Sequence, residues 1–192
     1  MVSRATPFDR TTLEAALGRL GEIAVAEGKI VEISVYGGSA LLLTFDSRIA
    51  TRDVDAVFES DRDFVRCAAA MIADEFGWSA DWINDGVKGF LSAHDADPDA
   101  KSLLRSYPSS QGPGLRVFVA SPSYLFAMKC LAMRLGGAEV SQDVEDIRLL
   151  AGELGIRTAK DAMMIVSRYY PDGRISPKTR FSLEELFGPP EG

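Results

Sequence analysis

Two carboxylates separated by one residue give this sequence its clearest chemical signal. Asp53 and Asp55 lie on either side of Val54 in an otherwise apolar segment. In a β-strand, residues two apart point to the same face, so both acids would project together. Like charges at that distance repel each other unless a cation lies between them. Mg²⁺ is commonly held by one or two carboxylates together with substrate phosphates. The pair therefore predicts a magnesium site that a phosphate-bearing substrate would complete.

A double glycine lies upstream of these acids. Gly37-Gly38-Ser39 follows an apolar run that alternates over residues 30–36, and thirteen residues separate Ser39 from Asp53. Glycine permits a positive φ and lets a ligand approach the backbone. A helix that begins there would offer free N–H groups to a phosphate, and Ser39 adds a hydroxyl. A phosphate-binding turn and a metal-binding pair on neighbouring strands predict a nucleotide-transfer site. The alternative is a tight turn followed by an exposed strand with two solvated acids.

The spacing of apolar residues predicts the elements that would position these side chains. Strands are expected at residues 30–36, 54–58 and 115–120. Helices are expected over residues 11–28, where Thr11 and Glu14 form a capping box, and over residues 61–76, 122–135, 143–154, 158–169 and 182–187, with a helical turn at 40–43. We therefore predict an α+β fold. A small mixed β-sheet flanked by helices would occupy residues 1–120, and a helical C-terminal half would occupy residues 121–192.

The composition is that of a globular protein with a substantial core. Apolar residues make up 46% of the chain and charged residues 26%. No apolar run reaches the roughly 18–20 residues that cross a bilayer, and the polar start lacks the apolar segment of a signal peptide. Cys67 and Cys130 have no CxxC or histidine neighbour, so we expect reduced, buried thiols and a cytoplasmic location. The net charge of −7 argues against a broad, sequence-independent grip on nucleic acid.

The Gly38-Ser39 pair followed by Asp53-x-Asp55 resembles the signature of the DNA polymerase beta-like nucleotidyltransferases. Within that superfamily the chain is most similar to the AbiEii-type toxin nucleotidyltransferases and their uncharacterised bacterial relatives. The similarity extends over residues 30–155. The segments that carry it are 37–40, 51–55, 81–85, 121–129 and 143–147. The resemblance implies a nucleotidyltransferase-type mixed sheet and a transfer of NMP from an NTP to an acceptor hydroxyl.

The resemblance also implies roles for individual residues. Ser39, with Gly37 and Gly38, would help to hold the triphosphate, and Asp53 and Asp55 would bind Mg²⁺, with a two-metal site expected. Two further residues are implied, Lys129 to pair with nucleotide phosphates and Asp146 to lie near the acceptor or assist its deprotonation. The superfamily often has a third acid on a later strand, but the strand at 115–120 has none. Either Asp146 replaces it or the second metal is weakly held.

The family also implies partners. The acceptor would be RNA or a small molecule, and the protein would be the toxin-like component of a bacterial toxin–antitoxin or phage-defence pair, with a cognate antitoxin. The alternative is a catalytically silent module of the same fold that binds a nucleotide or a protein. Without the resemblance, the alternative for Lys129 is a surface lysine whose aliphatic stem covers apolar neighbours. Asp143 and Asp146 fit an exposed first turn of a helix, where acids are favoured.

Overall fold

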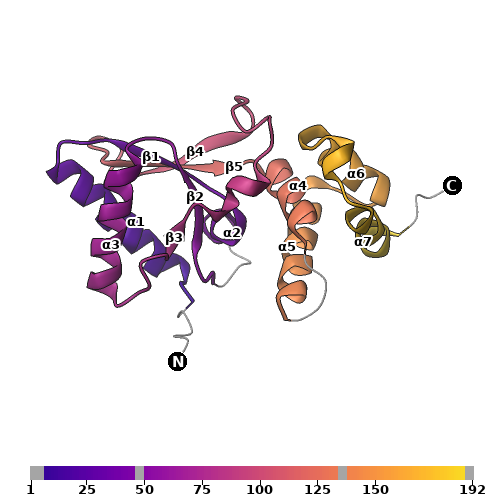
Figure 1. Ribbon diagram of the computed structural model, residues 1–192, viewed down its shortest axis with the longest axis horizontal. Coiled ribbons are helices and arrows are strands. Elements are labelled where there is room, and N and C mark those ends of the chain that lie inside the picture. The colour runs from indigo at the N-terminus through magenta and orange to yellow at the C-terminus, as the bar shows by residue number, and fades with distance from the viewer. Residues whose placement is uncertain (1–6, 46–49, 134–137, 189–192) are drawn as a thin grey trace. The chain divides into compact units, whose positions relative to one another are not determined.

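Five strands form one mixed β-sheet in the computed structural model, which describes residues 7–45, 50–133 and 138–188 (Figure 1). The strands are β1 (Val31–Val35), β2 (Val54–Phe58), β3 (Ile83–Asn84), β4 (Lys101–Tyr107) and β5 (Leu115–Ala120), in the spatial order β3-β2-β1-β5-β4. β1 pairs antiparallel with β2 and parallel with β5, while β3 pairs parallel with β2 and β4 antiparallel with β5. The three predicted strands are confirmed. The two edge strands, β3 and β4, were not predicted.

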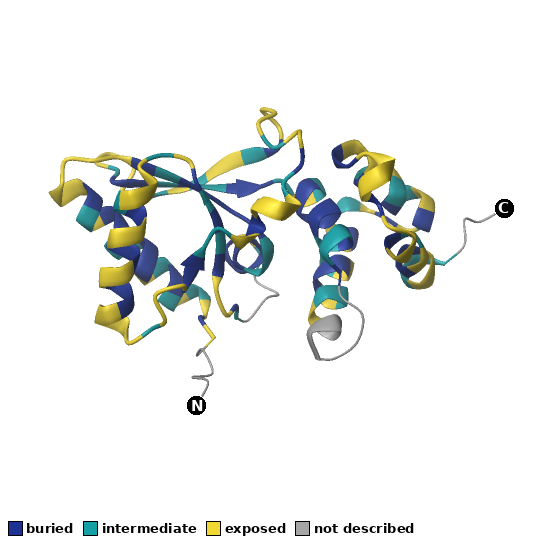
Figure 2. Ribbon diagram, in the orientation of Figure 1, coloured by how far each residue is buried: buried dark blue, intermediate teal, exposed yellow. Residues whose placement is uncertain are grey.

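The register divides the sheet into two faces. Val35 lies opposite Ala56 on β2 and opposite Val119 on β5, and all three side chains are buried. This apolar face consists of Val31, Ile33, Val35, Val54, Ala56, Phe58, Leu115, Val117 and Val119 (dark blue along the strands in Figure 2). The alternate residues, on the strands and just beyond their ends, form what we call the polar face. It carries Glu32, Ser34, Asp53, Asp55, Glu59, Lys101, Arg116 and Phe118.

Helices α1 (Arg10–Ala26) and α3 (Arg62–Phe76) pack against each other, and α1 also packs against β4 and β5. Arg105 of β4 reaches Glu14 of α1 at 3.1 Å, and Arg105 lies opposite Val117, so α1 covers the apolar face. The predicted capping box at Thr11 is wrong. The helix begins earlier because the Asp9 carboxylate accepts the Thr12 N–H at 2.8 Å and is the N-cap.

The C-terminal part of the chain is helical, as predicted. It contains α4 (Pro122–Ala132), α5 (Ala138–Leu154), α6 (Ala159–Tyr169), the 3₁₀ turn η2 (Asp172–Arg174) and α7 (Pro177–Phe187). Helix α4 packs against α5, α6 and α7. Of the helix predicted over 122–135, the last two positions lie outside the described residues. The predicted short helix at 182–187 begins earlier, because Ser176 caps α7 by accepting the Thr179 N–H.

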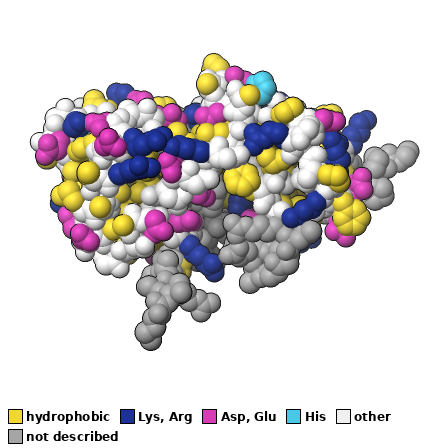
Figure 3. Space-filling model, viewed as in Figure 1, with side chains coloured by type: hydrophobic (Ala, Val, Ile, Leu, Met, Phe, Trp, Pro, Cys, Tyr) yellow, Lys and Arg dark blue, Asp and Glu magenta, His cyan; other side chains and the backbone are white. Residues whose placement is uncertain are grey.

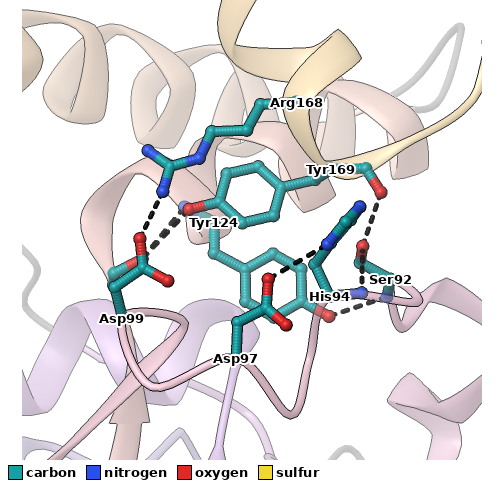
Figure 4. Close-up of polar contacts among 8 residues, drawn as sticks. Ser92, His94, Asp97, Asp99, Tyr124, Arg168 and Tyr169 are labelled. Carbon is teal, nitrogen blue, oxygen red and sulfur yellow. Dashed lines mark hydrogen bonds and ion pairs between the residues drawn. The ribbon is translucent and has the colours of Figure 1, made fainter.

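The chain divides into two compact units. Unit 1 comprises Met1–Gly89 and Lys101–Ala120, and unit 2 comprises Phe90–Ala100 and Ser121–Gly192. The segment 90–100 therefore lies with the helices, although the sequence boundary was expected at residue 120. Figure 4 shows how it is held: the Ser92 N–H donates to the Tyr124 hydroxyl at 2.7 Å, and the Ser92 hydroxyl donates to the Tyr169 carbonyl. The Arg168 guanidinium also pairs with Asp99.

The predicted fold class, a mixed sheet flanked by helices and followed by a helical half, is confirmed. Within the described ranges, no helix combines the length and the apolar character needed to span a membrane. Both cysteines are free thiols. Cys130 is buried as expected, but the prediction for Cys67 is wrong because it lies on the exposed side of α3.

Candidate functional site

The two predicted metal ligands lie on the polar face of the sheet. Asp55 is the second residue of β2, and Asp53 is the exposed residue just before the strand. Val54 and Ala56, on either side of Asp55, are fully buried, which directs the intervening side chain to the polar face. Asn84 of β3 is the register partner of Asp55, and its amide donates to the Asp53 carboxylate at 3.4 Å. Both acids therefore project from one edge of the polar face, beside an amide group.

The double glycine forms the transition from β1 to α2 (Gly37–Thr44). Only Tyr36 separates the strand from the helix, and its N–H donates to the Asp55 carbonyl at 2.9 Å. Gly37 has a φ of +59°, a conformation that L side chains rarely adopt. A Cβ at this position would also lie 2.6 Å from Asp55 Oδ2. The positive φ favours glycine at residue 37, and the carboxylate of Asp55 lies directly against the first turn of α2.

The first turn of α2 has backbone donors that precede its first hydrogen bond. That bond runs from the Ala40 N–H to the Tyr36 carbonyl at 3.2 Å, so the N–H groups of Gly37, Gly38 and Ser39 have no partner earlier in the helix. The Ser39 side chain is only 1% exposed, and its hydroxyl donates to the same Tyr36 carbonyl at 2.9 Å. In this conformation the hydroxyl stabilises the turn, and an anion would meet backbone N–H groups first.

The donor set on the polar face fits a hard divalent cation. Carboxylate oxygens are the ligands that Mg²⁺ prefers, and one or two are enough where substrate phosphates and water complete the shell. Among the described residues, no group of three or more histidine, cysteine, aspartate or glutamate side chains is placed to hold a metal. Asp53 and Asp55 would therefore act as a pair. The glycine at residue 37 lets the Asp55 carboxylate lie against this turn, because a Cβ there would be only 2.6 Å from Asp55 Oδ2.

The segment that follows Asn84 carries one charge of each sign, Asp85 and Lys88. Asp85 pairs with Lys88 at 2.5 Å and with Arg66 of α3 at 3.4 Å. The hydrogen bond from Lys88 holds the pKa of the Asp85 carboxyl below its usual value. In the view of Figure 3, basic side chains in dark blue gather over unit 1 with acidic side chains in magenta beside them. The surface in view is therefore of mixed sign and not a uniformly basic one.

Lys129 and Asp146 lie together in unit 2. The Lys129 ammonium, on α4, is 2.8 Å from Asp146 Oδ2 and 3.1 Å from Asp143 Oδ1, both on α5. The side chains are 15%, 3% and 19% exposed for Lys129, Asp146 and Asp143 respectively. The expectation of a surface lysine is therefore wrong, and so is that of an exposed Asp146. A charge network that links α4 to α5 holds both residues.

Three residues near the acid pair or on the same face, Asn84, Glu59 and Lys101, were not predicted as site residues from the sequence. Asn84 lies in a segment that carried the family resemblance, but its partnership with Asp53 depends on the two-residue strand β3. The Glu59 carboxylate accepts from both the Ser34 hydroxyl at 2.5 Å and the Lys101 ammonium at 2.9 Å. Lys101 belongs to β4, whose irregular polar sequence gives no alternation from which a strand could be predicted.

Comparison with known proteins adds one similar fold. No protein-family model matches the chain, and no curated protein matches it. The structure is similar to a crystal structure described as an antigenic nucleotidyltransferase-like protein from Paracoccidioides brasiliensis. The TM-score is 0.48 and the sequence identity 15%, over 95% of this chain and 94% of that one. A likeness at this level carries no conclusion about activity, so the functional argument depends on the side chains described above.

Proposed function

We propose that the protein is a Mg²⁺-dependent nucleotidyltransferase that moves an NMP from an NTP to an acceptor hydroxyl. The observation that carries the proposal is the position of Asp55 against Gly37: a carboxylate lies where the first turn of α2 presents its N–H groups. Asp53 lies two residues earlier on the same polar face. An anion-binding turn and a cation-binding pair in direct contact are what a metal–triphosphate complex requires.

Each part of this site has a chemical task. The N–H groups of Gly37 and Gly38 would bind phosphate oxygens and orient the triphosphate. Asp53 and Asp55 would hold Mg²⁺, which when bound neutralises phosphate charge and favours ionisation of the acceptor hydroxyl. The acceptor oxygen forms a bond to the α-phosphorus, the bond from that phosphorus to the bridging oxygen breaks, and pyrophosphate leaves. The hydroxyl proton passes to a nearby base or to water.

The family resemblance adds Lys129 and Asp146 to this proposal. Lys129 would bind a nucleotide phosphate, which requires its ammonium to exchange a carboxylate contact for a phosphate one. Asp146 would then be the carboxylate that the exchange releases toward the acceptor. Because the network of Lys129, Asp143 and Asp146 is largely buried, such an exchange needs a rearrangement between α4 and α5.

A transfer assay tests the proposal directly. The protein is incubated with each α-labelled NTP, Mg²⁺ and either total RNA or a panel of hydroxylated small molecules such as aminoglycosides. We expect labelled product from at least one combination, and loss of about a hundred-fold or more in Asp53→Asn and Asp55→Asn, since removal of a metal ligand removes several kcal/mol of charge stabilisation. Asp74→Asn, which changes an exposed acid of α3 in the same unit, is the matched control and should keep full activity.

Metal binding is measured separately from transfer. Titration with Mn²⁺, followed by electron paramagnetic resonance, should give a bound ion in the unaltered protein and in Asp74→Asn but not in Asp53→Asn. Nucleotide binding without transfer to any acceptor would contradict the enzyme and favour a silent binding module of the same fold. A transfer activity that survives both aspartate substitutions would contradict the assignment of the site.

The biological role in this proposal is that of a toxin-like component of a toxin–antitoxin or phage-defence pair, and it rests on the family resemblance alone. Its test is the gene neighbourhood together with co-expression. A small helix-turn-helix protein encoded beside this chain, whose co-expression relieves growth arrest caused by the chain, would support the role. Growth that is unaffected by expression of the chain would contradict it.

A further inference from the structure

The register of the sheet places a lysine in the same row as Asp55. Val35 lies opposite Ala56, and Val119 lies opposite both Val35 and Ser102. One residue further along each strand, the Tyr36 N–H donates to the Asp55 carbonyl and Ala120 lies opposite Lys101 at the start of β4, so these four positions form the row that follows Val35. Paired residues of neighbouring strands point to the same face of a sheet, and successive rows point to opposite faces. Asp55 and Lys101 therefore both belong to the polar face. Their strands are separated by β1 and β5.

The Lys101 side chain extends back across the sheet. Its ammonium is 2.9 Å from Glu59 Oε1, and the same oxygen accepts the Ser34 hydroxyl at 2.5 Å. Ser34 belongs to β1 and Glu59 follows β2, so the ammonium from the edge strand lies over the central strands. The lysine side chain is 16% exposed and that of Glu59 is 33% exposed. A lysine on an edge strand that binds nothing on this face would be expected to extend into water.

The acidic side chains on this face would repel a phosphate group unless positive charge lies nearby. Asp53, Asp55, Glu32 and Glu59 bring four carboxylates to the polar face, where Arg116 pairs with Glu32 at 3.0 Å. A phosphate group that approaches them needs positive charge beyond that of one divalent cation. A lysine ammonium is a compact, strongly hydrated charge suited to phosphate oxygens. Lys101 belongs to the same unit and the same face as the carboxylate pair, whereas the Lys129 ammonium is held by two carboxylates of α5.

We propose that Lys101 is a substrate-binding residue of the polar face, where it exchanges its contact with Glu59 for the oxygens of a substrate phosphate group. Glu59, which itself accepts the Ser34 hydroxyl, holds the ammonium over the central strands. This proposal rests on the proposed function and adds a binding residue to it. The phosphate has two sources, the NTP or a nucleic-acid acceptor, and the measurement below separates them.

The test compares binding by matched lysine variants. Lys101→Met, Lys101→Arg and Lys29→Met are titrated calorimetrically with each Mg²⁺–NTP and with Mg²⁺–pyrophosphate, and by fluorescence anisotropy with a short labelled single-stranded RNA. Lys29, which pairs with Asp61 at the start of α3, is another ion-paired lysine of unit 1 and serves as the control. Thermal unfolding of each variant shows whether it is folded.

We expect Lys101→Met to lower the affinity for one of these ligands by about ten-fold or more, since it removes a charge-assisted hydrogen bond. Lys101→Arg should stay within about three-fold of the unaltered protein, and Lys29→Met should be unchanged. Weaker binding of NTP and pyrophosphate assigns the phosphate to the nucleotide, and weaker binding of RNA alone assigns it to the acceptor. Unchanged binding of all three ligands by folded Lys101→Met would overturn the proposal.

A second variant separates binding from a purely structural ion pair. If Glu59 competes with phosphate for Lys101, then Glu59→Gln should tighten ligand binding by several-fold. The gain should vanish in the double variant Glu59→Gln/Lys101→Met, which isolates the part that depends on the lysine. An equal gain in the double variant would mean that only the removal of a negative charge matters, and Lys101 would have no part. Failure of the unaltered protein to bind any nucleotide would instead count against the proposed function.

Discussion

Each unit contains a pair of neighbouring acids, and the two pairs have different surroundings. In unit 2, Asp143 and Asp146 lie one turn apart on α5 and share the Lys129 ammonium, with Asp146 only 3% exposed. In unit 1, Asp53 is exposed beside the Asn84 amide, and Asp55 lies against the backbone of Gly37. The unit 2 acids thus have a lysine ammonium within ion-pair distance, whereas the two acids of unit 1 lie beside an amide and a glycine backbone. The same residue type therefore lies in a largely buried ion-pair network in one unit and on the polar face of the sheet in the other.

The largest expected effect on stability comes from removing the cation of unit 2. Lys129→Met leaves two carboxylates, one of them buried, without their ammonium, and should lower the free energy of unfolding by about 3 kcal/mol. Urea denaturation followed by circular dichroism measures this. Lys160→Met, at an exposed position of α6, is the control and should change stability by less than about 0.5 kcal/mol. A loss in Lys129→Met no larger than in the control would remove the contrast between the two acid pairs.

The two acids of unit 2 should themselves differ. Asp146→Asn replaces the more buried partner and should cost about 2 kcal/mol, whereas Asp143→Asn, at a position with 19% side-chain exposure, should cost about 1 kcal/mol or less. Asp53→Asn in unit 1 should change the unfolding free energy by less than about 0.5 kcal/mol, because the residue is exposed. Denaturation curves of the three variants under one buffer condition give the ranking. An Asp53→Asn loss as large as that of Asp146→Asn would make both pairs structural.

The glycine beside Asp55 is the point where the candidate site constrains the backbone. Gly37→Ala forces a side chain into a φ of +59° and places a Cβ 2.6 Å from Asp55 Oδ2, so stability should fall by about 1.5 kcal/mol. The displaced carboxylate should also weaken Mn²⁺ binding. Gly89→Ala is the matched control, since a Cβ there meets no atom within 4 Å. If Gly37→Ala binds Mn²⁺ like the control, the contact between turn and carboxylate has no bearing on the metal.

The smallest effect concerns pH and compares one helix cap from each unit. Asp61 caps α3 and Asp161 completes the capping box of α6, and hydrogen bonds lower the pKa of both carboxyls, chiefly from Lys29 to Asp61 and from the Thr158 hydroxyl to Asp161. Each therefore contributes stability that is present above the ordinary value of 3.8 and is lost as the pH falls through the lower folded pKa. The difference in unfolding free energy between the unaltered protein and Asp61→Asn or Asp161→Asn should shrink between about pH 5 and pH 2. A difference that grows toward acid pH would contradict the direction of both shifts.

The central strands were predictable because burial enforces their pattern. Residues 54–58 and 115–120 alternate between a buried face and a half-exposed one, and the structure has β2 and β5 with the predicted bounds. β4 could not be predicted, because an edge strand has few buried positions and its Lys101-Ser-Leu-Leu-Arg-Ser-Tyr107 sequence follows no period of two. β3 is too short to leave any pattern.

The candidate site shows the same limit. The common face of Asp53 and Asp55 follows from alternation within a single strand, so the sequence alone was sufficient. The neighbours of these acids depend on which strands pair and in what register, so neither Asn84 nor Lys101 could be assigned. For the same reason the sequence could suggest a task for Lys129 but not its partners, because Asp143 and Asp146 reach it only through the packing of α4 on α5.

The path of the chain between the units has a practical consequence for dissecting this protein. The backbone passes from unit 1 to unit 2 at residue 90, returns at residue 101 and leaves again at residue 121. A fragment that ends at residue 120 would therefore keep segment 90–100 but lack the helices that hold it, including the Tyr169 carbonyl that accepts from Ser92. Genetic exchange of the two units between proteins would need three junctions, after residues 89, 100 and 120. An end-to-end swap at a single junction would leave that segment without its partners.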